Sequence, residues 1–394
     1  MEWIVTDNIR RETWRRLLEY SNIDITIDEI AKRHGAITAK TAQNYKKQAE
    51  QVRVCVIQAK EYFDAGAAST IFTSPNHVYY GAVSLASMMM LILGNGDYSL
   101  DVLRRNHRNH HHGLKFKTDC TPRNVSNGLT LVEKTSAKIL RRGHFANWYS
   151  TLPKQNLVHA LVVRTGNTTV VNGVVTPGAT SQNWEVVGGS TVPTMEAMIG
   201  LEKAMVDLLK FIPDLSNELH RYQIHEPRTR SSHTANYTNK KINHQWALHG
   251  AASAHALEVV LSQFGVRPDM IDRISFSGVE NTHGAVVKID VNEAELPFFR
   301  WPSSRETLNH DTVSYGGDVE THEIVDFYLI GYQLSMMSRY YPDLWIRCIE
   351  SQCKAAKLIE TAVDIFLKKF PIMVLSTLSS NGMTISTHRP PWAS

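Results

Sequence analysis

The stretch Pro75–Leu93, "PNHVYYGAVSLASMMMLIL", decides the fold of this 394-residue chain. Thr73 and Ser74 precede the proline, and this is a helix-start signal because a hydroxyl can cap free N–H groups and proline fits the first turn. The residues that follow are apolar or small on nearly every side, which predicts a helix at the centre of a bundle. The apolar run from Tyr79 falls short of the roughly 20 residues that cross a bilayer. We therefore expect a cytoplasmic protein without a membrane partner.

Three further regions have apolar residues at helical spacing, namely 8–20, 39–65 and 321–367. They predict helices that pack around the central one. The segment after them, "KKFPIMVLSTLSS" at 368–380, is rich in apolar and β-branched residues and predicts a terminal strand.

The middle of the chain has a different pattern. Leu157–Val175 is rich in β-branched residues and is interrupted by Gly-Asn, which predicts a hairpin, and "AVVKIDV" within 272–299 predicts a second β region. Between them, residues 221–243 are polar and basic with few apolar anchors, so they predict a long exposed connection.

These elements indicate an α+β fold, predominantly α-helical with an inserted β-containing portion. Three segments are expected. Residues 1–150 form a helical unit, 151–320 a mixed segment with β-hairpins and the exposed basic connection, and 321–394 C-terminal helices that pack back on the first unit.

Composition excludes several classes of protein. With 43% apolar and 20% charged residues the chain is typical of globular proteins, and the net charge of +4 permits a local basic patch without requiring one. The four cysteines show no CxxC or metal-finger spacing and predict reduced thiols. No nucleotide-binding loop and no GxSxG motif is present in the sequence, and no cofactor is predicted.

Two segments carry a resemblance to a known family. The first is "QAKEYFDAGAASTIFTSPNHVYYGAVSLASMMMLI" (58–92), followed by "HHGLKF" (111–116), and the second is "YLIGYQLSMMSRYYPDLWIRCIE" (328–350). Their paired tyrosines, His-Gly, Leu-Ser, Arg-Tyr, Pro and Trp make the chain similar to the YaaC-like proteins of bacteria. The resemblance implies a helical fold with inserted strands and points to His112-Gly113 as family-typical. It implies no reaction.

Residues Leu103–Leu114, "LRRNHRNHHHGL", contain a second local similarity. Their "RNHRNH" resembles the Arg-polar-x-x-x-His motif of HEPN ribonucleases, which are usually dimeric and frequent in defence and toxin systems. The resemblance implies catalysis by Arg105 and His110, with Asn106 orienting them. A histidine can transfer the proton of a ribose hydroxyl while an arginine stabilises phosphorane charge without a metal. On a regular helix the two side chains would lie about 140° apart, so convergence requires a helix end, a loop or a dimer interface.

Other interpretations of this stretch remain open. A second match, "RTRSSH" at 228–233, shows that the pattern recurs by chance, and the histidines could belong to a structural turn or a ligand-binding turn. His107 and His111 have the i, i+4 spacing of zinc ligands, but partner carboxylates are scarce and no HExxH is present. We therefore predict no metal site.

Basic side chains cluster in two places and suggest contact with RNA or DNA phosphates. A solvated surface is the alternative for both clusters. The candidate nucleic-acid-binding residues are Arg104, Arg108, Lys115 and Lys117, together with Arg228, Arg230, Lys240 and Lys241.

Three functions follow from these patterns. The first is a nucleic-acid-binding or partner-binding component of a defence or toxin-type system, assembled with another protein in a multi-subunit complex. The second is a metal-independent HEPN-like ribonuclease effector, with a homodimer as one way to complete its site. The third is a structural or regulatory protein without catalysis.

Overall fold

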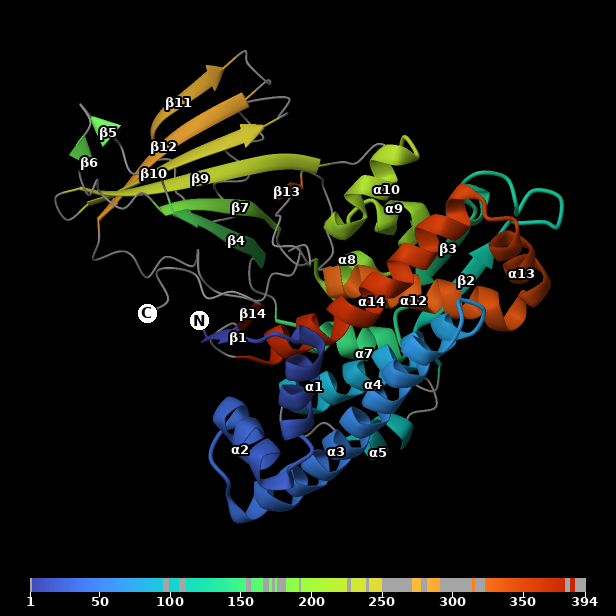
Figure 1. Ribbon diagram of the computed structural model, residues 1–394. Coiled ribbons are helices and arrows are strands. Elements are labelled where there is room, and N and C mark those ends of the chain that lie inside the picture. Colours follow the sequence, from blue (N-terminus) through green and yellow to red (C-terminus); the bar gives the residue numbers. More distant parts are fainter. Residues whose placement is uncertain are drawn as a thin grey trace.

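The computed structural model describes most of the helical part of the chain and the strands of the β part (Figure 1). It confirms an α+β fold that is predominantly helical, with a β-containing portion inserted between α7 and α12. The described residues are 2–94, 99–105, 111–153, 157–165, 170–171, 174–175, 182–190, 193–224, 228–238, 241–249, 271–277, 282–290, 314–315, 323–379 and 383–386.

The helices occur in two groups, before and after the inserted strands, with short helices between. Their bounds are α1 Ile9–Glu19, α2 Ile23–His34, α3 Ala39–Ala68, α4 Ser74–Leu93, α5 Leu100–Arg105, α6 Thr130–Glu133, α7 His144–Thr151, α8 Met195–Met198, α9 Met205–Leu209, α10 Ser216–Arg221, α12 Glu323–Tyr340, α13 Pro342–Glu350 and α14 Lys354–Leu378.

Helix α4 lies at the centre of the helical body, as its apolar sequence predicts (Figure 1). It packs against α3, α7, α12 and α14. Gly81 allows the close approach of α3, because a Cβ atom there would lie 2.6 Å from the Phe63 ring. Gly331 does the same between α12 and α14, where a Cβ would lie 2.7 Å from Phe366. Among the described helices, α4 alone has the length and composition of a membrane span, but 72% of its apolar window is buried inside the protein, as expected of a core helix.

The two segments that resemble the YaaC-like family meet at the contact between α4 and α12. The Tyr79 ring of α4 lies 5.6 Å from the Tyr328 ring and 5.7 Å from the Tyr332 ring of α12, both edge-on. Offset and edge-to-face arrangements at this spacing stabilise aromatic pairs beyond simple burial. Residues far apart in the sequence thus form one aromatic core.

The strands that the structure describes form four sheets. The largest lies to one side of the helical body and has the order β11-β12-β10-β9-β7-β4, with β13 added to β9 (Figure 1). A second sheet, β2-β3-β8, is antiparallel, β5 pairs with β6, and β1 pairs in parallel with β14. The bounds are β1 Glu2–Val5, β2 Leu114–Thr118, β3 Thr135–Ile139, β4 Leu157–Thr165, β5 Val170–Val171, β6 Val174–Val175, β7 Gln182–Ser190, β8 Glu202–Ala204, β9 Arg228–Thr238, β10 Lys241–His249, β11 Ile271–Ser277, β12 Thr282–Asp290, β13 Ser314–Tyr315 and β14 Met383–Ser386.

Two predictions from the sequence are wrong. Residues 221–243 are not a long connection, because β9 and the first three residues of β10 fall there and pair antiparallel inside the large sheet. Pairing satisfies the backbone N–H and C=O groups of this polar segment, so it forms strands although it has no pattern of apolar residues. Residues 368–380 are not a strand, because α14 continues through Pro371 to Leu378. Phe366, Phe370 and Val374 are buried at helical spacing, and this packing outweighs the β-branched composition.

Candidate functional site

The site begins at a crossing of two glycine turns. Gly113 has φ +80° and Gly143 has φ +110°, and a Cβ on Gly143 would lie 2.5 Å from the Gly113 backbone. The backbone N–H of His144 donates to the His111 carbonyl at 2.9 Å, and the N–H of Phe145 donates to the His112 carbonyl at 2.9 Å. Only glycine fits both positions, since the conformation disfavours side chains and the space is filled. The crossing brings His111, His112 and His144 together at one edge of α4.

His112 and His144 are held by tyrosines of the central core. The Tyr79 hydroxyl lies 2.9 Å from Nδ1 of His112, and the Tyr328 hydroxyl lies 2.9 Å from Nδ1 of His144. The two tyrosines also contact each other through their rings, which pack edge-on with centroids 5.6 Å apart. The two His–Tyr pairs, from α7 and α12 and from α4 and the turn before β2, thus lie side by side in one aromatic cluster.

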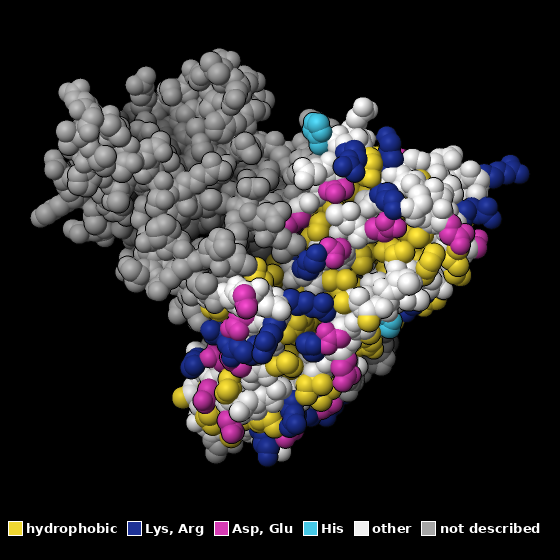
Figure 2. Space-filling model, viewed as in Figure 1, with side chains coloured by type: hydrophobic (Ala, Val, Ile, Leu, Met, Phe, Trp, Pro, Cys, Tyr) yellow, Lys and Arg dark blue, Asp and Glu magenta, His cyan; other side chains and the backbone are white. Residues whose placement is uncertain are grey.

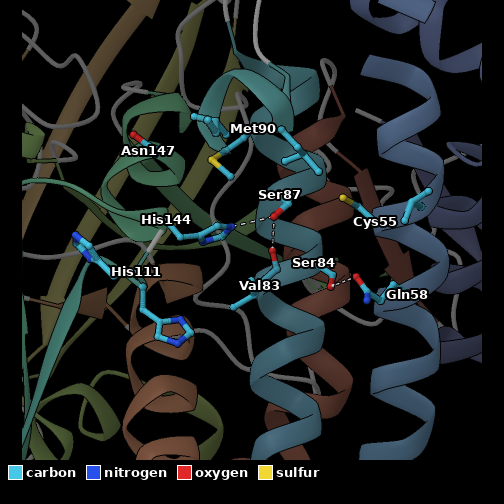
Figure 3. Close-up of a pocket in the computed structure, with 13 residues that line it drawn as sticks. Cys55, Gln58, Val83, Ser84, Ser87, Met90, His111, His144 and Asn147 are labelled. Atoms are coloured by element: carbon cyan, nitrogen blue, oxygen red, sulfur yellow. Dashed lines mark hydrogen bonds between the residues drawn. The ribbon is translucent and has the colours of Figure 1, made fainter. Parts of the chain in front are cut away.

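The other nitrogen of His144 faces Ser87 of α4 (Figure 3). Nε2 lies 2.9 Å from the Ser87 hydroxyl, which itself donates to the Val83 carbonyl at 2.9 Å. With its proton used on Val83, the hydroxyl accepts from Nε2–H. This assigns the tautomer in which Nδ1 of His144 accepts from Tyr328. His144 is therefore oriented by both of its ring nitrogens.

The network is electrically neutral near pH 7. Burial, with a smaller effect from His112, lowers the pKa of His144 to about 4. Burial also lowers the pKa of His112, and the nearby Arg339 charge adds to this shift. For Tyr79 and Tyr328, burial raises the pKa above its ordinary value. Neutral imidazoles and phenols can donate and accept hydrogen bonds without the cost of a buried charge.

Arg339 lies at the far end of this network and is half-buried. Its guanidinium donates to the Tyr80 hydroxyl and, at 3.4 Å, to the Ser335 carbonyl, and it lies 5.2 Å from the Tyr80 ring. The Ser335 hydroxyl donates to Asn76 at 3.0 Å. Ser335, Arg339 and Tyr80 therefore join α4 to α12.

A cavity of about 350 Å³ opens beside His144 and Ser87 (Figure 3). On its α3 side, the Ser84 hydroxyl donates to the Gln58 side chain at 3.3 Å. The lining residues that the structure describes include no Asp, Glu, Lys or Arg, so its polar groups are neutral hydroxyls, amides and imidazoles. The lining consists of Val54, Cys55, Gln58, Val83, Ser84, Ser87, Met90, Leu100, Leu103, His111, His112, His144 and Asn147.

Of the three proposed ribonuclease residues, the structure describes Arg105. Arg105 is exposed at the last position of α5, while Asn106 and His110 lie outside the described residues. Leu103 and His111, which flank this stretch, both line the cavity. The convergence of Arg105 and His110 stays a prediction. The second match, 228–233, lies on β9, where five extended residues separate the two Cα atoms by about 17 Å.

No metal cluster of three or more His, Cys, Asp or Glu side chains occurs in the described part of the chain. His111 is exposed and lines the cavity, and its Nδ1 accepts from the N–H of Gly113 at 3.0 Å. His107, its predicted zinc partner, lies outside the described residues.

Two of the predicted nucleic-acid-binding residues are exposed on strand β2. Lys115 lies directly opposite Lys138 of β3, so the two like charges share one face of the sheet. Lys117, two residues on, contacts Glu202 of β8 at 3.4 Å. Arg141 and Arg142 are exposed in the turn between β3 and the His144 helix. We call Lys115, Lys117, Lys138, Arg141 and Arg142 the basic strip.

The remaining predicted basic residues are distributed elsewhere. Arg104 is in α5, Arg228 and Arg230 are in β9, and Lys241 is in β10, and for these four the structure describes the backbone alone. Arg108 and Lys240 lie outside the described residues. The described strand residues of the two predicted clusters thus belong to different sheets, with Lys115 and Lys117 in β2-β3-β8 and Arg228, Arg230 and Lys241 in the large sheet.

On the face shown in Figure 2, Lys and Arg side chains are interleaved with Asp and Glu over α1 to α3. Ion pairs such as Arg15–Glu12 at 2.7 Å and Lys32–Glu29 at 2.7 Å account for this mixture. The mixed face contrasts with the basic strip, where Lys115 opposes another lysine.

Sequence patterns did not identify His144, Ser87 or Tyr328 as members of one network. They are separated by 57 and 184 residues from their hydrogen-bond partners, and none belongs to a recognisable local motif. The sequence did contain one signal, namely Gly143 before His144 together with His112-Gly113. Two glycines allow their backbone segments to approach closely, and this brings the neighbouring histidines together.

The comparisons with known proteins identify the family. A family model described as YaaC-like Protein matches residues 21–378. No curated protein and no solved structure matches the chain. The similarity to HEPN ribonucleases therefore rests on the local motif alone. Because the family model covers nearly the whole sequence, including both segments that meet at α4 and α12, this chain belongs to the YaaC-like protein family.

Proposed function

We propose that this protein binds single-stranded nucleic acid, with phosphates along the basic strip and one base in the neutral cavity. The observation that carries the proposal is the exposed pair of Lys115 and Lys138, which lie directly opposite each other beside the turn that forms the cavity wall.

The lysine pair favours an anionic partner. Like charges directly opposite on one face of a sheet destabilise it. Glu202 of β8 lies opposite Lys138 and also contacts Lys117, so one carboxylate offsets part of the repulsion and the strip keeps an excess of positive charge that an anionic partner would offset. Residues 111–142 contain seven Lys and Arg but only two Asp and Glu, whereas the whole chain has a net charge of +4. Phosphates spaced along a strand would neutralise such a local excess.

The strip and the cavity are adjacent because they share backbone. Lys115 lies in β2, shortly after His112. Arg142 directly precedes Gly143, whose backbone crosses that of Gly113. A strand whose phosphates lie on the strip would therefore pass the exposed side chain of His111 at the cavity edge.

The cavity has the size and chemistry for a base. About 350 Å³ is at the lower end of small-ligand pockets. Gln58, Ser84 and Asn147 offer neutral donors and acceptors that match the edge of a base, whereas an ionised group would lack a counter-charge there. A base reaches such a cavity only when it is unpaired, which favours a single strand over a duplex.

Binding of a fluorescein-labelled single-stranded RNA, followed by anisotropy, tests the proposal. Affinity should fall more than about tenfold between about 50 and about 200 mM salt if three or more phosphates are contacted. The double variant Lys115→Glu, Lys138→Glu should lose binding at low salt. The matched control is Lys32→Glu, Lys46→Glu, which changes the same charge on exposed positions of α2 and α3 and should retain affinity. Equal affinities of the two double variants, or no binding by the unaltered protein at low salt, would contradict the proposal.

The ribonuclease is the second candidate, because the stretch 106–110 is bracketed by the cavity residues Leu103 and His111. In this function Arg105 stabilises phosphorane charge and His110 transfers the proton, with Asn106 orienting them, in a defence or toxin-type setting. Arg105→Ala and His110→Ala should each abolish RNA cleavage and leave the melting temperature nearly unchanged, and cleavage should survive EDTA. Cleavage that persists in both variants would exclude this function while leaving RNA binding possible.

A further inference from the structure

Two cysteines face each other where α13 ends and α14 begins. Cys348 lies in the last turn of α13 and Cys353 is the N-cap residue of α14, and their sulfur atoms are 3.6 Å apart. The turn between them is tight: the Ser351 hydroxyl donates to the Cys348 carbonyl at 2.6 Å, and Gln352 has φ +54°. Both thiols are free.

The surroundings of Cys353 favour its thiolate. The Cys348 thiol donates a hydrogen bond to Cys353, and the backbone N–H of Ala356 adds to it, which lowers the pKa of Cys353 below its ordinary value. The same hydrogen bond and burial raise the pKa of Cys348. The N-terminus of the 25-residue α14 also favours a negative charge at this position.

The two sulfur atoms differ in their access to solvent. Cys353 is half-buried, whereas Cys348 is buried beneath it. The other two cysteines have different surroundings: Cys55 is buried on α3, and the Cys120 thiol is 3.8 Å from the Thr130 carbonyl. A small oxidant from solvent would therefore meet Cys353 first.

We propose that Cys353 is a hydroperoxide-reactive thiol and that Cys348 is its resolving partner. The thiolate sulfur of Cys353 attacks the peroxide, an S–O bond forms as the O–O bond breaks, and the released alkoxide or hydroxide takes up a proton. Cys353 is now a sulfenic acid. The sulfur of Cys348 attacks it, the S–S bond forms as the S–O bond breaks, and hydroxide leaves with the Cys348 proton as water. The two sulfurs together lose two electrons, and the peroxide gains them and is reduced to alcohol or water.

The geometry permits the second step with little movement. A disulfide has an S–S length of about 2.05 Å, so the sulfurs must approach by roughly 1.5 Å from their present 3.6 Å. The product would join α13 to α14 through a loop of four intervening residues, and a low-molecular-weight thiol would reverse it by exchange.

The test is to treat the reduced full-length protein with hydrogen peroxide under native conditions and map its thiols by peptide mass spectrometry. The expected result is a fall from four free thiols to two, with a Cys348–Cys353 disulfide that dithiothreitol reverses. In Cys348→Ser, oxidation should stop at a sulfenic acid on Cys353 that dimedone traps, while in Cys353→Ser no disulfide should form. Cys120→Ser is the control and should behave as the unaltered protein.

Alkylation adds a readout that does not need the variants to fold. At pH 7, iodoacetamide should modify Cys353 of the unaltered protein about tenfold faster than Cys120. Four free thiols after peroxide treatment, a disulfide between other cysteines, or equal alkylation of Cys120 and Cys353 would each overturn the proposal.

Discussion

The hydroxyl of Tyr79 lies 2.9 Å from Nδ1 of His112, and this contact joins the central helix to the turn that begins the basic strip. Tyr79 is fully buried, and its ring also packs edge-on against Tyr328 and Tyr332. The contact links residues of the family-like segments that are 33 positions apart. It therefore determines where the strip and the cavity stand relative to the helical core.

The first prediction concerns this hydrogen bond. Tyr79→Phe and His112→Ala should each lower the melting temperature by several degrees, because each leaves the other group without its buried partner. In a double-mutant cycle the two changes should couple by about 0.5–1.5 kcal/mol. Thermal unfolding of the four proteins measures the coupling, and the exposed Tyr341→Phe is the control. Strictly additive effects would show that the contact contributes no stability.

The glycine crossing gives the second prediction. Gly143→Ala should destabilise the protein by more than about 2 kcal/mol, because its Cβ would overlap the Gly113 backbone and its φ is +110°. Gly200→Ala is the matched control: its φ is +83°, but no atom lies within 4 Å of the added Cβ. It should cost only about 1 kcal/mol, the price of the backbone conformation. Urea unfolding of both variants separates the two effects, and equal losses would contradict the close crossing.

The third prediction is a pH dependence of stability. His144 has a folded-state pKa of about 4, below its unfolded value near 6.5, and burial is the main cause. The unfolded chain therefore binds a proton at His144 before the folded protein does, so stability is present above pH 6.5 and is lost as the pH falls toward 4. The loss from this group should be about 3 kcal/mol. Urea unfolding at several pH values should show a weaker acid dependence for His144→Gln, and the same dependence in both proteins would contradict the prediction.

Filling the cavity should separate base binding from phosphate binding. Val54 lines the cavity and is 63% exposed, so Val54→Trp would occupy its mouth without disturbing the core. RNA affinity should fall about three- to tenfold, a loss in binding free energy comparable to that of one base contact. The salt dependence of binding should stay unchanged. Ile25→Trp on α2, 44% exposed, is the control. Unchanged affinity of Val54→Trp, measured by anisotropy, would show that no base enters the cavity.

Much of the helical fold is predictable from local pattern. The run up to Leu93 is apolar on nearly every side, and the structure places it as α4 in the core. Helix α3 follows equally from its periodic apolar positions. By contrast, β9 lacks an apolar alternation, and β9 and β10 are held between the distant strands β7 and β12, while the end of α14 is decided by burial against the bundle. Such contacts between distant segments leave no local signal.

The candidate site was predictable only in part. The histidine-rich stretch and the His-Gly turn could be read directly, since they lie within twelve residues of one another. The network around His144 could not, because Tyr328 comes from α12 and Ser87 from α4. The opposition of Lys115 and Lys138 also depends on the register of β2 and β3, which a sequence pattern does not give.

The salt dependence of RNA binding tests the central proposal most directly. The slope of log Kobs against log salt concentration should become shallower by about 1.4 when Lys115 and Lys138 are both changed to Gln, because each phosphate contact on a single strand contributes about 0.7. The same variant should be about as stable as the unaltered protein, since the loss of the like-charge pair is offset by the loss of the cross-strand attraction between Lys138 and Glu202. A slope equal to that of the unaltered protein, with Lys32→Gln, Lys46→Gln as the control, would contradict phosphate binding at this lysine pair.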